Sequence, residues 1–164
     1  MTVLAFAAGH SSLQMLSEAD LRAALEGLCR DKRSFAELRE AAAHPGFVRA
    51  LIDRLPAGAE RVLREVAPDR IRLPGGRQVR VRYARNQPPW VASRLQDFFG
   101  MRETPRIARG GVSLVVHLLA PSQRPVQTTT DLAGFWERLY PQVRRELSRR
   151  YPRHAWPEDP LGGG

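Results

Sequence analysis

The chain has 164 residues, of which 26 are basic and 17 acidic, and its formal net charge is +9. This length allows one domain or two small ones, and such a chain folds without requiring disulfides or a structural metal. Because Lys32 is the only lysine, nearly all cations are arginines, whose planar guanidinium groups suit phosphate oxygens. The charge indicates either a polyanionic partner or an ordinary arginine-rich surface.

Cysteine content and hydropathy argue against a disulfide-stabilised protein and against a secreted or membrane-spanning one. Cys29 is the only cysteine, which excludes an intramolecular disulfide framework and favours a reducing compartment. The early apolar run from Val3 to Ala8 is shorter than the core of a signal peptide, and no stretch approaches the roughly 20 apolar residues that span a bilayer. We therefore expect a cytoplasmic protein with no membrane partner.

Residues 1–68 are predicted to form a small bundle of four helices. Ser17 precedes an acidic first turn, and Ser34 with Glu37 has the spacing of a capping box, in which each side chain accepts from a backbone N–H of the other residue. Apolar residues recur with helical spacing after each cap, and again after a break at His44-Pro45-Gly46. The fourth helix is expected over about residues 57–66, because prolines bound that segment on both sides.

The pattern changes at residue 69, where we expect a second domain to begin and to extend to residue 161. Apolar and charged residues alternate on both sides of Pro74-Gly75-Gly76, as in a hairpin with one buried face. The apolar face is predicted to be buried, which leaves four arginines on the other face: Arg70, Arg72, Arg80 and Arg82.

Strand and helix signals continue after the hairpin. Residues 91–99 are predicted to form a short helix that ends at Gly100. Residues 112–119 are more continuously apolar, which predicts one strand in the centre of the sheet, paired with residues 124–129.

A long amphipathic helix is expected from about residue 131 to 151, with a kink or a break at Pro141. The segment beyond it holds three prolines in ten residues and is expected to be extended, and residues 162–164 are expected to be a disordered tail. The predicted fold class is α+β, with an N-terminal helical bundle followed by a small antiparallel or mixed sheet packed with a long kinked C-terminal helix.

Common catalytic signatures are missing from the sequence. Lys32 has no glycine nearby, and the pairs Gly75-Gly76 and Gly110-Gly111 precede neither a lysine nor a helix start, so no phosphate-binding loop is expected. One cysteine and four scattered histidines give no recognised zinc spacing. We therefore expect no catalytic residue, no metal site and no bound cofactor in this chain.

Arginines and aromatic side chains together are typical of surfaces that bind single-stranded nucleic acid. The candidates for such contacts lie on the hairpin, around a glycine loop and along the last helix and tail: Arg72, Arg80, Arg82, Arg106, Arg109, Arg144, Arg145, Arg149, Arg150 and Arg153. The alternative is that the helix arginines form a solvated face or dock an acidic domain. Four aromatic residues are expected in the core and not as platforms for bases: Phe98, Phe99, Phe135 and Trp136.

Several motifs between residues 56 and 161 are more specific than these patterns. They are Arg124-Pro125-Val126-Gln127, Asp131-Leu132 with Phe135-Trp136, and Arg150-Tyr151-Pro152 through Trp156-Pro157-Glu158-Asp159-Pro160. This part of the chain resembles the C-terminal domain of HrpB-type bacterial DEAH-box ATP-dependent helicases. Residues 1–55 are only loosely similar to the helical region that precedes this domain in such helicases.

The resemblance implies an accessory module without ATPase or unwinding activity of its own. The phosphate-binding loop, the Asp-Glu-Ala-His box and the arginine finger of this family belong to upstream motor domains, so ATP and magnesium would bind there. We expect a module that binds single-stranded RNA or DNA, RNA more than DNA, or braces the motor domains in cis or in trans. The alternative is a protein-interaction domain that docks on a helicase or another acidic partner without contacting nucleic acid.

Overall fold

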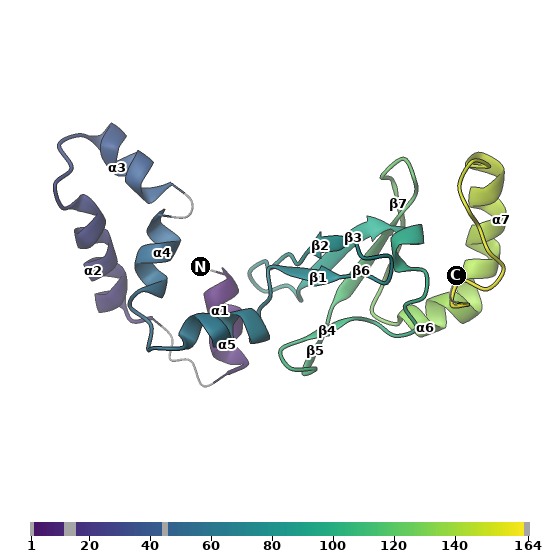
Figure 1. The fold of residues 1–164 in the computed structure, drawn as a ribbon, viewed down its shortest axis with the longest axis horizontal. Coiled ribbons are helices and arrows are strands. Elements are labelled where there is room, and N and C mark those ends of the chain that lie inside the picture. Colours follow the sequence, from purple (N-terminus) through teal and green to yellow (C-terminus); the bar gives the residue numbers. More distant parts are fainter. Residues whose placement is uncertain (1, 12–15, 44–45, 163–164) are drawn as a thin grey trace. The chain divides into compact units, whose positions relative to one another are not determined.

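Helices form the first of two units, and strands combine with helices in the second (Figure 1). A computed structural model describes residues 2–11, 16–43 and 46–162, and the chain divides into the units between residues 67 and 68. The α+β fold class predicted from the sequence is confirmed. None of the helices in these three ranges is long and apolar enough to span a bilayer.

Within the described residues, the first unit contains one more helix than predicted. Its helices are α1 (Thr2–Gly9), α2 (Glu18–Cys29), α3 (Phe35–Ala42), α4 (Gly46–Ile52) and α5 (Ala59–Val66). The additional helix is α1, an alanine-rich stretch with good helix formers, whose Ala7 is fully buried. The predicted break at His44-Pro45 lies outside the described residues.

The two predicted N-caps are confirmed. The Ser17 hydroxyl accepts a hydrogen bond from the Asp20 backbone N–H at 3.1 Å, and the Asp20 carboxylate accepts one from the Ser17 N–H at 2.9 Å. The Ser34 hydroxyl accepts from the Glu37 N–H at 3.2 Å, but the Glu37 carboxylate accepts from Arg33 instead of Ser34. The capping box predicted for Ser34 and Glu37 is therefore only half formed, whereas Ser17 and Asp20 form a complete one.

Short strands in the second unit form one three-stranded sheet and two hairpins. The strands are β1 (Arg70–Arg72), β2 (Gln78–Arg80), β3 (Trp90–Arg94), β4 (Arg106–Ile107), β5 (Val112–Ser113), β6 (Val115–Leu119) and β7 (Pro125–Thr129). The sheet has the order β3-β6-β7, with β3 and β6 parallel and β6 and β7 antiparallel. The pairs β1–β2 and β4–β5 are antiparallel.

The hairpin at Pro74-Gly75-Gly76 and the central position of β6 are confirmed. The single strand predicted over residues 112–119 is wrong in one respect, because it is divided into β5 and β6. The Leu114 N–H still donates to the Pro105 carbonyl beside β4 at 2.9 Å, whereas the Val115 N–H donates to the Pro89 carbonyl beside β3 at 2.9 Å, so the chain changes its partner strand between these two residues.

The helix predicted over residues 91–99 is also wrong, because this segment begins as β3 and only then turns into the short 3₁₀ helix η1 (Leu95–Phe98). Val91 and Ser93 are buried and alternate with more exposed neighbours, which is the period of a strand. The Asp97 carboxylate accepts from the Ser93 hydroxyl at 2.6 Å and from the Arg94 N–H at 3.2 Å, where the strand ends. Gly100 follows in the left-handed region, with φ +84°.

The predicted C-terminal helix is interrupted immediately before Pro141. It consists of α6 (Leu132–Gly134), a π-helical turn η2 (Phe135–Leu139) and α7 (Tyr140–Arg150). The Tyr140 N–H bonds to the Phe135 carbonyl five residues back. Proline has no N–H and its ring collides with the carbonyl four residues earlier, so the wider turn accommodates Pro141 without ending the helix.

Aromatic side chains from η1, η2 and α7 form the centre of the second unit, as predicted for Phe98, Phe135 and Trp136, whereas Phe99 is only partly buried. Phe98, Phe135 and Trp136 are at most 5% exposed, and the Trp136 and Tyr140 ring centroids are 5.3 Å apart. The Trp136 indole donates to the Met101 carbonyl at 2.7 Å. The helical segment is thereby fixed against the loop that follows η1.

Alkaline pH should destabilise this core through buried tyrosines. Burial raises the pKa of Tyr140 to about 12 and raises the pKa of Tyr83 as well. Because an unfolded tyrosine ionises near pH 10, the stabilisation is complete below about pH 10 and is lost as the pH rises through the folded pKa. Urea denaturation between about pH 9 and 11 should show a falling free energy of unfolding. Tyr140→Phe should flatten this dependence, and an unchanged pH profile would contradict the explanation.

Candidate nucleic-acid interface

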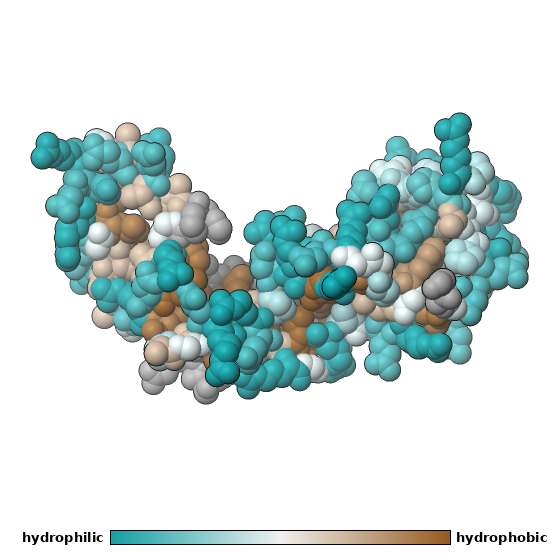
Figure 2. Space-filling model, viewed as in Figure 1, coloured by the Kyte–Doolittle hydropathy of each residue, from teal (hydrophilic) through white to brown (hydrophobic). Residues whose placement is uncertain are grey.

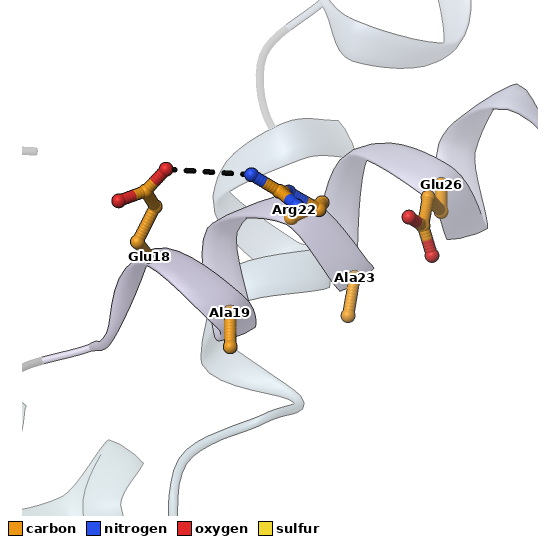
Figure 3. Close-up of a pocket in the computed structure, with 5 residues that line it drawn as sticks. All are labelled: Glu18, Ala19, Arg22, Ala23 and Glu26. Atoms are coloured by element: carbon orange, nitrogen blue, oxygen red, sulfur yellow. Dashed lines mark hydrogen bonds and ion pairs between the residues drawn. The ribbon is translucent and has the colours of Figure 1, made fainter.

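The hollow drawn in Figure 3 does not have the features of an active site. It lies along α2, and one helix supplies its lining: Glu18, Ala19, Arg22, Ala23 and Glu26. Glu18 and Arg22 form an ion pair at 3.5 Å, with side chains 88% and 72% exposed. Such a solvated pair contributes little energy. Because one face of a single helix lines the hollow, it is open to solvent.

The glycine pairs do not fit a nucleotide site either. Gly75-Gly76 connects β1 to β2, and Gly110-Gly111 connects β4 to β5, so neither pair leads into the first turn of a helix. A phosphate-binding loop needs that turn because its free backbone N–H groups hold the phosphate. Among the residues that the structure describes, no group of three or more histidine, cysteine or acidic side chains is placed to hold a metal ion.

The hairpin has the two faces that the sequence predicts. Leu73, Val79 and Val81 are buried, whereas the hairpin arginines are exposed: Arg70, Arg72, Arg80 and Arg82. The register places Arg70 opposite Arg80 and Arg72 opposite Gln78. In Figure 2 the visible face of the second unit is mostly hydrophilic, with apolar residues in narrow strips.

One carboxylate divides the hairpin arginines into two kinds. Asp69 lies 3.6 Å from Arg70 and 3.3 Å from Arg80, so these two guanidinium groups share an acidic neighbour. Arg72 and Arg82 have no acidic partner among the described residues. These two guanidinium groups are therefore available to an anionic partner outside the unit.

In the loop between β4 and β5, the two candidate arginines differ in what holds them. The Arg106 guanidinium donates to the Gly110 carbonyl at 2.6 Å and to the Ser113 hydroxyl at 2.9 Å, which braces the turn. Arg109 is exposed next to it, and three successive residues have positive φ: Ala108 at +52°, Arg109 at +55° and Gly110 at +84°. Non-glycine residues are rare in this region, and such strain is often found at functional sites.

The arginines of α7 and the tail differ in a similar way. Arg144 donates to the Trp156 carbonyl at 2.8 Å and lies 3.3 Å from Glu158, so it holds the extended tail against the helix. Arg149 donates to the Arg145 carbonyl within its own helix at 3.1 Å. The remaining candidates in this group are exposed: Arg145, Arg150 and Arg153.

The ten candidates therefore do not form one patch. Within the second unit, Figure 1 shows α7 at the end away from β1 and β2. The structure brings the hairpin arginines together on one face, while Arg106 and Arg144 are used in contacts within the chain.

Two aromatic residues near the hairpin were not among the candidates. Trp90 begins β3 and is partly exposed, and its ring centroid lies 4.8 Å from that of His117 on β6. No local sequence signal identifies this face, because the residues of β3 do not alternate between apolar and polar types and the burial alternation arises only from the fold. The helix prediction over residues 91–99 concealed it.

Comparisons of this chain with a family model, with curated proteins and with solved structures identify the same family. The family model described as ATP-dependent helicase C-terminal, HrpB, matches residues 24–160. The ATP-dependent RNA helicase HrpB of Escherichia coli (strain K12) is 42% identical over 111 residues, which cover 68% of this chain and 14% of that protein. The match to the family begins inside α2 and so includes much of the helical unit.

Two crystal structures resemble this chain. One is of the E. coli DExH-box NTPase HrpB, with a TM-score of 0.68 and 30% identity, covering 90% of this chain and 22% of that one. The other is of the Escherichia coli DEAH/RHA helicase HrpB, with a TM-score of 0.70 and 33% identity. It covers 94% of this chain and 20% of that one. The chain thus spans a small part of the length of these relatives.

Proposed function

The chain belongs to the family of HrpB-type ATP-dependent helicase C-terminal domains, and from this membership we propose that it is the accessory C-terminal module of such a helicase. In this role it binds single-stranded nucleic acid, RNA in preference to DNA, and braces motor domains in cis or in trans. ATP and magnesium bind to those motor domains, and this chain has no ATPase or unwinding activity of its own. The module acts in the cytoplasm and has no membrane partner.

The observation that carries this proposal is the position of the two arginines without an acidic partner. In the hairpin register, Arg72 and Arg82 lie on either side of the Arg70–Arg80 pair. They are four residue steps apart along the hairpin, or about 14 Å at the rise of an extended strand. A single strand that follows the hairpin can therefore place two of its phosphates, separated by about one intervening phosphate, against the two guanidinium groups. Such contacts position the strand without reading its bases.

The dependence of affinity on salt tests this proposal directly. Each phosphate contact with a single strand changes the logarithm of the affinity by about 0.7 for every tenfold change in salt, so the contacts at Arg72 and Arg82 alone predict a roughly sevenfold loss between 50 and 200 mM. Fluorescence anisotropy with a labelled single-stranded RNA measures it. The same affinity at both salt concentrations would contradict phosphate binding, and equal loss for different base sequences would support it.

A second candidate function is supported by exposed apolar side chains on the helical unit. Phe35 on α3 is 86% exposed and Leu25 on α2 is 49% exposed. Large exposed apolar residues are typical of protein interfaces when they form part of a patch. A protein-interaction domain would use them to dock on the motor domains without contacting nucleic acid. Capture of purified motor domains by a chain that shows no RNA binding would favour this function.

A further inference from the structure

We propose that Trp90 and His117 form a base-stacking platform that continues the arginine face of the hairpin. This inference rests on the proposed binding of single-stranded nucleic acid and names a further part of that site. Arginines account for contacts with phosphates, but a single strand also exposes its bases, which aromatic side chains can hold by stacking.

The antiparallel bridge between Arg82 and Trp90 places their side chains on the same face of the sheet. The Arg82 N–H donates to the Trp90 carbonyl at 2.8 Å, and the Trp90 N–H donates to the Arg82 carbonyl at 3.0 Å. Two residues that exchange both hydrogen bonds in an antiparallel pair have side chains on one face. Arg82 is exposed and Val81 is buried, so this face is the outer one.

The same face continues across the sheet. Trp90 is partly exposed and Val91 is fully buried, and the parallel register places Ala92 opposite His117. The Trp90 and His117 rings lie 4.8 Å apart with their planes at 58°. On the next strand, the exposed Thr128 shares a hydrogen bond of 3.2 Å with His117 Nδ1.

Trp90 differs from the two other tryptophans in its indole N–H. Trp136 Nε1 donates to the Met101 carbonyl at 2.7 Å, and Trp156 Nε1 donates to the Tyr151 carbonyl at 2.9 Å. Within the described part of the chain, Trp90 Nε1 has no acceptor. A structural tryptophan normally finds one. The partly exposed Trp90 ring, with a donor still available, fits a residue that contacts an external partner.

The chemistry across the sheet favours nucleic acid as that partner. Going outward from the hairpin, this face presents first an arginine without an acidic neighbour, Arg82. Two aromatic rings and a hydroxyl follow, from Trp90, His117 and Thr128. These groups match a phosphate, one or two bases and a sugar or base edge. An acidic peptide would match the arginine but would not use the ring faces.

Replacing Trp90 tests the platform separately from the phosphate contacts. Trp90→Ala in the full chain should weaken binding of a uridine oligonucleotide at least about fivefold, the lower limit for losing one stacked base, while the slope of affinity against salt stays the same. Trp90→Phe keeps an aromatic ring, so on a logarithmic scale its loss of affinity should be less than about half of the loss caused by Trp90→Ala. His154→Ala is a control for the loss of another ring of the same unit, because His154 is exposed and lies outside the proposed platform, and it should leave the affinity unchanged.

A fluorescence measurement covers the case in which Trp90→Ala fails to fold. Stacking of uridine on Trp90 should quench part of the tryptophan fluorescence of the wild-type chain, and Trp90→Phe should remove that quenching while circular dichroism stays the same. Normal salt-dependent binding with no change in affinity or quenching would overturn the platform and leave the proposed function intact. A wild-type chain that does not bind the oligonucleotide at all would overturn both.

Discussion

Neutralising two arginines together, as Arg72→Gln with Arg82→Gln, should weaken binding of single-stranded RNA about 25-fold at 0.1 M salt. Both side chains are exposed, and neither has an acidic partner in the described part of the chain. Each phosphate contact with a single strand contributes about 0.7 to the salt slope, so the double variant should also lower that slope by about 1.4. Anisotropy titrations over a series of salt concentrations measure both quantities.

Two further variants make this result specific. Arg22→Gln removes the same charge from the helical unit, where Arg22 is 72% exposed and paired with Glu18, and should leave the affinity unchanged. Arg80→Gln should have a smaller effect than either Arg72→Gln or Arg82→Gln, because Arg80 already shares Asp69. If Arg22→Gln weakens binding as much as the hairpin variants, only the net charge matters and the hairpin is not the site.

Replacing Trp136 with alanine should lower the free energy of unfolding of the second unit by about 3–5 kcal/mol, as expected for a large aromatic residue in a core. Trp136 is only 5% exposed, and its ring lies 5.1 Å from that of Phe135 and 5.3 Å from that of Tyr140. The cavity would open where the π-helical turn packs against the rest of the unit. Chemical denaturation followed by circular dichroism measures the loss.

The variant Trp136→Phe keeps most of the aromatic packing at this position and removes the hydrogen bond. It keeps an aromatic ring but leaves the Met101 carbonyl without the indole donor 2.7 Å away, which should cost about 1–3 kcal/mol. A loss below about 1 kcal/mol for Trp136→Ala would show that the aromatic cluster is not the centre of this core.

Local signals predicted the elements whose structure depends on neighbouring residues. The caps at Ser17 and Ser34 and the alternation around Pro74-Gly75-Gly76 each involve residues close in sequence. The arginine face follows from the same alternation, because side chains of a strand point to opposite sides in turn. These features were therefore accessible without knowledge of the fold.

The segment after the hairpin was predicted incorrectly because its structure depends on distant partners. Residues 91–99 contain apolar residues at spacings that suit a short helix, but pairing with β6 converts the first part into β3. Parallel pairing with a strand more than 20 residues away leaves no local sequence signal. The same applies to the division between β5 and β6, where Leu114 bonds to Pro105.

The sequence by itself determined the positive charge, the hairpin with its arginine face and the motifs of the helicase family. Only the tertiary structure decided which charges remain available to a partner. Arg106 and Arg144 find acceptors within the chain at Gly110 and Trp156, whereas Arg72 and Arg82 find no acid among the described residues. The physical reason is that arginines look alike in a sequence, and their partners depend on which backbone and side-chain oxygens the fold brings within reach.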